Sequence, residues 1–281
     1  MGRGILYFAK GDKFVLEAEK SANRTRELMD CPIALVTNIE TNANVFDDIM
    51  IDTADFTWSD KPESLLKSPY EKTIFLDSDI WLEESVSGLF DVLDQFELVL
   101  AKDPREDHVH YMDKTHPING VPEAFPEYNT GVVAYRQTPD VTQLFKEWQR
   151  RCKPDHVHDQ LSFRTSLYQS TVRFATLRPE YNCMYRAHNA LNGDVKVFHG
   201  KLARESHHPS LNEALQKLNQ QSGPRVSYGY DPYVETIPPR SLSTYLRSRL
   251  IRLRSIVEQE GIGAAVKRTG SFLRRRFSRK N

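Results

Sequence analysis

The most informative segment of the sequence reads Thr73-Ile74-Phe75-Leu76-Asp77-Ser78-Asp79-Ile80-Trp81. Its apolar residues run without interruption into two aspartates, which predicts a strand buried on both faces inside a parallel sheet. Asp77 and Asp79 then fall at the carboxyl end of that strand, where open α/β sheets bind their ligands. Two carboxylates at this spacing can share a hard divalent cation, and the cation can hold a diphosphate. We therefore hypothesise a metal–nucleotide site, although two solvated aspartates at a strand end would give the same pattern.

The segments around it alternate between predicted strands and helices. A first buried strand is predicted at 5–9, a helix at 14–29 with Asp12 as its N-cap, and a second strand at 32–37. Because strand, helix and strand at this spacing form a right-handed βαβ unit, we expect an α/β fold with a parallel sheet. Further strands are predicted at 49–51, 98–101, 171–177 and 194–198, and further helices at 85–96, 141–151 and 158–168.

The composition is that of an ordinary globular protein, with 39% hydrophobic and 27% charged residues among 281. The formal net charge of zero hides an asymmetry. Residues 240–281 hold twelve Arg and Lys against two Glu, a local charge of +10, so the preceding residues carry −10. Three cysteines without a CxxC pair indicate reduced thiols and a cytoplasmic location. No signal peptide or transmembrane segment is expected.

The basic C-terminal segment has the pattern of an amphipathic helix, since apolar residues recur at helical spacing and arginines flank them. The apolar positions are Leu242, Tyr245, Leu246, Leu250, Leu253, Ile256 and Val257. We expect this tail to bind an anionic membrane surface, which would make the protein peripheral on the inner face of the membrane. A helix packed on the acidic body, or a disordered basic arm, would have the same composition. Nucleic acid is not expected as a partner, because no recognisable nucleic-acid-binding module accompanies the arginines.

Four segments occur in the order seen in GT-A glycosyltransferases. They are the first strand, the segment 68–79 that ends in the two aspartates, the segment 127–132 with Asn129-Thr130-Gly131, and the pair Asp159-Gln160. On these residues the chain resembles the nucleotide-diphospho-sugar transferase group of that superfamily, and it is similar to the DxD-containing family 8-like enzymes. The resemblance covers roughly residues 4–201. It implies a GT-A (Rossmann-like) mixed, mainly parallel sheet flanked by helices. The basic helical tail that follows is predicted from its own sequence pattern.

The resemblance implies a catalytic domain and an activity, and the composition of the remaining residues gives the other two parts of the chain. A catalytic domain is expected over 1–205, a connector over 206–239 and the tail over 240–281. The implied activity is metal-dependent transfer of a sugar from a nucleotide-diphosphate donor, expected to be a UDP-sugar, to an unidentified acceptor. A tail that holds the enzyme at a membrane would suit a saccharide or lipid-linked acceptor there, an expectation that depends on the tail alone. Two alternatives stay open. One is a metal-dependent nucleotide-sugar phosphohydrolase that uses the same carboxylates, and the other is a non-catalytic protein that docks on a membrane or a partner.

The resemblance also implies a metal site. A DxD pair in these enzymes holds Mn²⁺ or Mg²⁺, which stabilises the leaving diphosphate as the sugar–phosphate bond breaks. Asp79 is expected to bind the metal directly, and Asp77 to contact the metal, the ribose or both. His199, at the end of a late predicted strand, is the expected third ligand, although a purely structural histidine would fit the same place. The longer family pattern after this histidine, with Gly and Lys-Pro-Trp, is not present here.

Donor binding and catalysis are implied at further positions. Asp159 could orient the sugar or acceptor, act as the general base of an inverting reaction, or only cap a helix, and Gln160 is the second catalytic candidate. Asn129-Thr130-Gly131 is predicted to be a turn that leads into a strand up to Tyr135. Glycine at 131 would allow close backbone approach to a ligand, although an ordinary turn would also contain it. The residues expected to bind the donor, besides Asp77, are Ala9, Lys10, Arg24, Ser78, Asn129, Thr130, Gly131 and Lys201.

The segment 102–126 is predicted to be a long loop of the kind that often serves as a lid. It contains the pair His108-His110, and a similar pair, His156-His158, occurs later. Alternate spacing on a strand would put each pair on one side, as zinc ligands require. The polar, proline-flanked surroundings offer no obvious scaffold, so we do not expect zinc there.

Overall fold

A computed structural model describes residues 2–53, 56–57, 60–105, 120–152, 160–185, 187, 189–200, 210–220, 223–230, 233–237 and 257. The chain divides into two compact units, Met1–Ile237 and Pro238–Asn281, and Val257 is the described residue of the second unit. The other residues of the predicted tail, both histidine pairs, Asp159 and Lys201 lie outside the described residues. None of the described helices has the length and apolar composition that crossing a membrane requires.

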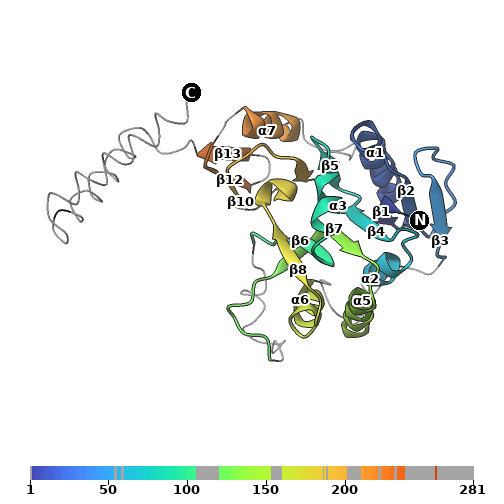
Figure 1. Cartoon of the computed structure of the whole chain (residues 1–281). Helices are drawn as coiled ribbons and strands as arrows, with labels where there is room; N and C mark the ends of the chain where they lie inside the picture. Colours follow the sequence, from blue (N-terminus) through green and yellow to red (C-terminus); the bar gives the residue numbers. More distant parts are fainter. Residues whose placement is uncertain are drawn as a thin grey trace, which may run out of the picture. The chain divides into compact units, whose positions relative to one another are not determined.

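A seven-stranded sheet with the order β3-β2-β1-β4-β7-β6-β8 forms the centre of the first unit (Figure 1). Its strands are β1 (Arg3–Ala9), β2 (Ile33–Thr37), β3 (Asp48–Ile51), β4 (Lys72–Asp77), β6 (Leu98–Lys102), β7 (Tyr128–Arg136) and β8 (Phe174–Leu177). Neighbouring strands are parallel, except that β7 runs antiparallel to both β4 and β6. The side chains of Ile74, Phe75 and Leu76 in β4 are fully buried. The predicted mixed, mainly parallel α/β sheet is confirmed.

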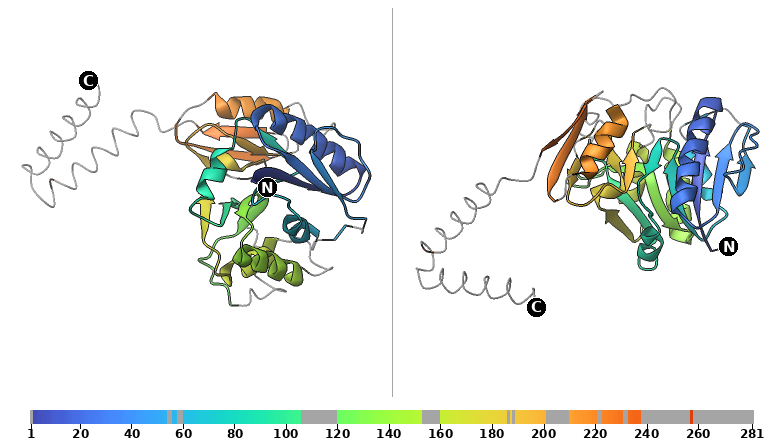
Figure 2. Two further views of the ribbon diagram at one scale, coloured as in Figure 1. Left: turned by 45° about the vertical axis from the view of Figure 1, so that its right-hand side comes forward. Right: turned by 90° about the horizontal axis from the view of Figure 1, so that it is seen from above.

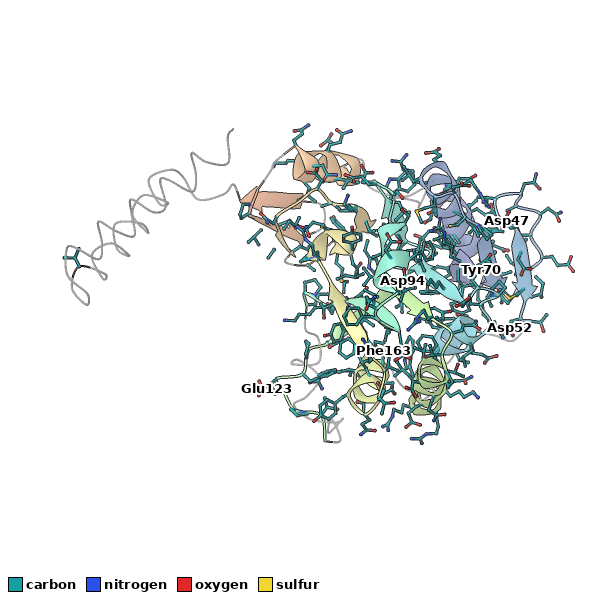
Figure 3. The ribbon with its side chains drawn as sticks, viewed as in Figure 1. Asp47, Asp52, Tyr70, Asp94, Glu123 and Phe163 are labelled. Atoms are coloured by element: carbon teal, nitrogen blue, oxygen red, sulfur yellow. The ribbon has the colours of Figure 1, made fainter. Side chains whose placement is uncertain are left out.

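Helices cover both faces of this sheet, as Figures 1 and 2 show. Helices α1 (Asp12–Leu28) and α3 (Gly88–Val92) bury their apolar residues on one face. Helices α2 (Asp60–Leu66), α5 (Pro139–Arg151) and α6 (Gln160–Tyr168) do so on the other face. There Phe163, labelled in Figure 3, packs against Trp148 with ring centroids 4.7 Å apart. Two separate apolar layers therefore hold the central sheet in place.

Two three-stranded sheets adjoin the main sheet. One has the order β5-β11-β9, from Ile80–Leu82, Val197–His199 and Cys183–Met184. The other has the order β10-β12-β13, from Asn189–Leu191, Arg225–Tyr230 and Tyr233–Ile237. Helix α7 (Ser210–Asn219) buries Leu215 and Leu218 in a cluster with Phe198 of β11. The segment 206–239, expected from the sequence to be a connector, thus contains α7, β12 and β13.

Three local predictions are wrong. Asn129-Thr130-Gly131 lies within β7 and not in a turn before a strand. Helix α3 covers only Gly88–Val92 of the predicted segment 85–96. Asp12 is the first residue of α1, whose N-cap is Gly11 with φ of 88°. That value of φ favours glycine, so the helix starts from a backbone conformation without a side-chain cap.

Candidate metal and donor site

Asp77, Asp79 and His199 come together through the pairing of β5 with β11. Asp77 is the last residue of β4, and Asp79 lies in the two-residue turn before β5. Strand β11 runs antiparallel to β5 and places His199 opposite Ile80, the residue after Asp79. The backbone N–H of Gly200 donates to the carbonyl of Asp79 at 3.1 Å, which fixes the turn to the end of β11. As a result, potential ligand atoms of the three side chains lie within 4.8 Å of one another.

The imidazole of His199 lies between a carboxylate and an amide. Its Nε2 is 3.2 Å from Asp79 Oδ1, and its Nδ1 is 3.0 Å from Asn182 Oδ1. Burial alone would lower the pKa of His199, but the nearby carboxylates of Asp79 and Asp77 raise it above its ordinary value. Protonation of Nε2 therefore competes with the binding of a cation to this atom.

The donor set fits a divalent cation such as Mn²⁺. Two carboxylates and one imidazole nitrogen suit a cation of hard to intermediate character, and Mg²⁺ accepts the same oxygens. The hydrogen bond from His199 to Asn182 is of the kind that orients metal-binding histidines in proteins. Among the described residues, these three are the group of His, Cys, Asp and Glu side chains that could hold a metal.

Lys61 of α2 contacts the same site, and the sequence did not point to it. Its ammonium lies 2.8 Å from Asp77 Oδ1 and donates to Thr130 Oγ1 at 3.1 Å. The same ammonium lies 5.4 Å from the ring centre of Phe75. Because α2 has seven residues and contains Pro62, no helical periodicity indicated that Lys61 would face Asp77. Lys61 brings a positive charge to the carboxylate that is expected to face the donor.

Two of the expected nucleotide-binding cations are engaged elsewhere. The ammonium of Lys10 is buried, 2.8 Å from Asp60 Oδ2 and 3.5 Å from Asp52 Oδ2. Asp52, labelled in Figure 3, follows β3 directly. Arg24 donates to the carbonyls of Leu82 and Glu83 at the end of β5. Both cations therefore contribute to holding the elements around the site together.

Ser78 and Ala9 lie close to the carboxyl edge of the sheet. Ser78 stands between the two aspartates, and its hydroxyl donates to Glu17 Oε2 at 3.0 Å. Ala9 ends β1 and is 3% exposed. Phe14 follows on the first turns of α1 and is 44% exposed, so an aromatic ring is accessible to solvent just after β1. From the sequence, Phe14 is only the first residue of a predicted helix.

Gln160 lies in a buried polar network. Its Nε2 donates to Asp103 Oδ2 at 2.7 Å and also to Glu127 Oε1, and its Oε1 accepts from Asn129 Nδ2 at 3.3 Å. Burial alone would raise the pKa of Asp103, but Arg105 and Gln160 hold it below its ordinary value. Asp103 is therefore ionised at neutral pH. Both ends of the Gln160 amide are bonded within the protein, which makes it a structural connection between β6, β7 and α6.

Gly131 provides the space that His199 occupies. A Cβ atom at this position would lie 2.4 Å from His199 Cε1 and 2.9 Å from Nδ1. The sequence suggested that this glycine admits a ligand close to the backbone. In the structure the group that approaches it is the imidazole of the candidate metal ligand.

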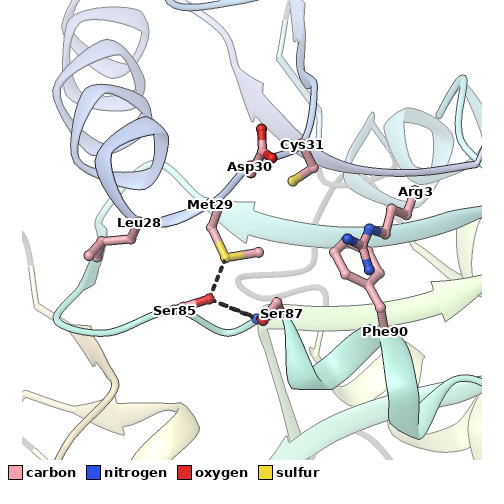
Figure 4. A pocket seen from close by; sticks show the side chains of 8 residues that line it. All are labelled: Arg3, Leu28, Met29, Asp30, Cys31, Ser85, Ser87 and Phe90. Atoms are coloured by element: carbon pink, nitrogen blue, oxygen red, sulfur yellow. Dashed lines mark hydrogen bonds between the residues drawn. The ribbon is translucent and has the colours of Figure 1, made fainter.

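A pocket, drawn in the close-up of Figure 4, lies near the amino end of β1, away from the candidate metal site. Arg3, one of its residues, begins β1, whereas Phe8 near the other end of that strand is in register with Asp77. Burial raises the pKa of the Cys31 thiol in this pocket to about 11, so the thiol is protonated at neutral pH. The pocket is lined by Arg3, Leu28, Met29, Asp30, Cys31, Ser85, Ser87 and Phe90.

Comparisons with known proteins agree on one class. The family model of nucleotide-diphospho-sugar transferases matches residues 48–198, more than half of the chain. The chain is similar in structure to the bifunctional glycosyltransferase WbbM, with 15% identity and a TM-score of 0.51 over 74% of this chain and 46% of that chain. It is also similar to the galactosyltransferase LgtC in complex with donor and acceptor sugar analogs, with 14% identity and a TM-score of 0.51. That match covers 76% of this chain and 94% of LgtC.

At these identities the structural likeness shows the fold alone, and the chain spans about half the length of WbbM. No curated protein sequence matches the chain. The matched segment 48–198 contains both aspartates of the candidate metal site, and His199 follows it directly.

Proposed function

The chain belongs to the nucleotide-diphospho-sugar transferase family, and from this we propose that it transfers a sugar from a nucleotide-diphosphate donor, a UDP-sugar, with the help of a divalent cation. The glycosyltransferase class expected from the sequence is confirmed by the family match and the shared fold. The observation that carries the metal-dependent part is the convergence of Asp77, Asp79 and His199 within 4.8 Å.

In this proposal Asp79 and His199 hold the cation, and Asp77 shares its carboxylate between the cation, the donor ribose and Lys61. When bound, Mn²⁺ or Mg²⁺ neutralises charge on the diphosphate as the sugar–phosphate bond breaks. The ammonium of Lys61 stands at the same carboxylate and would add a second positive charge toward the diphosphate. Ser78 and Thr130 lie beside the proposed diphosphate position. The exposed ring of Phe14 would stack on the nucleotide base.

Donor binding with the metal can be tested by thermal unfolding of the full chain with a panel of nucleotide sugars. We expect one donor to raise Tm by roughly 5 °C or more at a concentration about 100 times its Kd, because a ligand that binds the native state stabilises it. The rise should appear with Mn²⁺ present and vanish with EDTA. A donor-dependent rise that EDTA leaves unchanged would remove the metal from the proposal, and no rise with any nucleotide sugar would remove the donor.

We further propose that the basic residues of 240–281 bring the enzyme to an anionic membrane, where a lipid-linked or cell-surface saccharide would be the acceptor. This proposal rests on the sequence of the tail. The full chain should sediment with vesicles containing phosphatidylserine and be released by added salt, which screens the charges. Substituting Arg274, Arg275 and Arg276 by glutamine should weaken sedimentation. Sedimentation that is equal with neutral vesicles would contradict the electrostatic mechanism.

A further inference from the structure

A continuous series of buried side-chain amides connects Asp103 to His199. Gln160 Nε2 donates to Asp103 Oδ2, and Asn129 Nδ2 lies 3.3 Å from Gln160 Oε1 and 3.4 Å from Asp103 Oδ2. Asn182 Nδ2 donates to Asn129 Oδ1 at 2.8 Å, and Asn182 Oδ1 is 3.0 Å from His199 Nδ1. Gln160, Asn129 and Asn182 are each 9% exposed or less.

Two groups determine the direction of these hydrogen bonds, because one can act only as an acceptor and the other only as a donor. The ionised carboxylate of Asp103 can only accept, so the NH₂ groups of Gln160 and Asn129 must face it. The backbone N–H of Gly131 can only donate, and it lies 2.9 Å from Asn129 Oδ1. Both ends of the Asn129 amide are therefore determined by its neighbours.

The orientation of Asn129 determines that of Asn182 and then of the imidazole. Because Asn129 presents its oxygen, Asn182 must turn its NH₂ group toward it and its oxygen toward His199. An amide oxygen next to Nδ1 accepts a hydrogen bond, so Nδ1 must carry the proton. The Nε2 atom on the other side of the ring faces Asp79 at 3.2 Å.

We propose that Asn182 is a positioning residue for the metal site: oriented through Asn129 and Gln160 by Asp103, it keeps the proton of His199 on Nδ1 and leaves the lone pair of Nε2 for the cation. The proposal rests on the proposed function, because it assumes that His199 binds the metal. The proposal also explains why the side-chain amides of Gln160, Asn129 and Asn182 are hydrogen-bonded to one another inside the protein and do not face a sugar. Buried amides cost free energy unless they are hydrogen-bonded, and here each one finds its partner in the next.

The decisive variants are Asn182→Leu and Asn182→Asp, with Asn192→Leu as a matched control at an exposed position near β11. Leucine removes the acceptor at Nδ1, and we expect Mn²⁺ affinity to fall by about 10- to 100-fold, the usual effect of losing such a partner. Aspartate keeps an acceptor there and should retain much more of the affinity than leucine. The control should bind Mn²⁺ like the wild type. Affinity is measured from the electron paramagnetic resonance of free Mn²⁺.

A second measurement reports the proton directly and uses the wild-type protein. With ¹⁵N-labelled histidine and the diamagnetic probe Cd²⁺, His199 should show a protonated Nδ1 and a metal-bound Nε2, with its signal assigned by its loss in His199→Ala. An unprotonated Nδ1, or equal Mn²⁺ affinity in Asn182→Leu and the wild type, would overturn the positioning role. Failure of the metal site itself is a different result, because wild type and His199→Ala would then bind Mn²⁺ equally.

Discussion

Replacing Asp79 by alanine is expected to lower metal-dependent donor turnover by at least about 10²-fold, the size of effect seen when one group that stabilises developing charge is removed. Asp79 is the carboxylate that contacts His199, at 3.2 Å, and it belongs to the group of three side chains that could hold a metal. Without it the cation would keep only Asp77 and His199 as ligands, and Asp77 already faces Lys61. The remaining ligand set should bind Mn²⁺ weakly.

The measurement is release of the nucleotide from the donor identified by thermal unfolding, with Mn²⁺ titrated into both proteins. Asp194→Ala serves as the control, since Asp194 is an exposed aspartate three residues before β11. It should leave turnover and Mn²⁺ affinity unchanged. If Asp79→Ala folds with the Tm of the wild type and turns over the donor at the wild-type rate, the metal site lies elsewhere and the central proposal fails.

The two aspartates could be found from the sequence because their signal is local. Because β4 is buried on both faces, its sequence is an uninterrupted apolar run. The run ends at the carboxyl edge of the sheet, where α/β proteins bind their ligands. His199 could be placed at the same edge by the same reasoning applied to Val197 and Phe198. Its exact position depends on antiparallel pairing with β5, which no local pattern specifies.

The supporting residues could not be found in this way. Asp103, Asn182 and Lys61 belong to no motif that the sequence displays, and their roles arise from contacts with residues 16 to 57 positions away. Asn129-Thr130-Gly131 was misread because asparagine and glycine favour turns. Pairing of Asn129 with β6, and of the residues from Val132 onward with β4 and β6, extends the strand through these residues across a register shift. The glycine is explained by the imidazole beside it.

Replacing Gly131 by alanine is expected to disrupt the metal site by displacing the imidazole of His199. The new Cβ would lie 2.4 Å from His199 Cε1, closer than such atoms can approach, and 3.0 Å from Asn129 Oδ1, which is a tight contact. Gly131 lies at a register shift between β7 and β6, but Asn129 pairs with β6 on one side of it and β7 pairs with both β4 and β6 from Val132 and Val133 onward, so the backbone is held on either side of Gly131. The ring must shift instead, which would break its hydrogen bond to Asn182 and move Nε2 away from Asp79.

We therefore expect Gly131→Ala to lower the free energy of unfolding by about 1–3 kcal/mol, the usual cost of overpacking a buried position, and to lower Mn²⁺ affinity by about 10- to 100-fold. Urea unfolding and Mn²⁺ titration measure the two effects. Gly88→Ala is the control, because a Cβ at Gly88 meets nothing within 4 Å. Since alanine favours a helix over glycine, that control should be neutral or slightly stabilising. A contradicting result would be a folded Gly131→Ala protein with wild-type Mn²⁺ affinity. The contact between His199 and Gly131 of β7 would then not be needed to align the imidazole with Asp79.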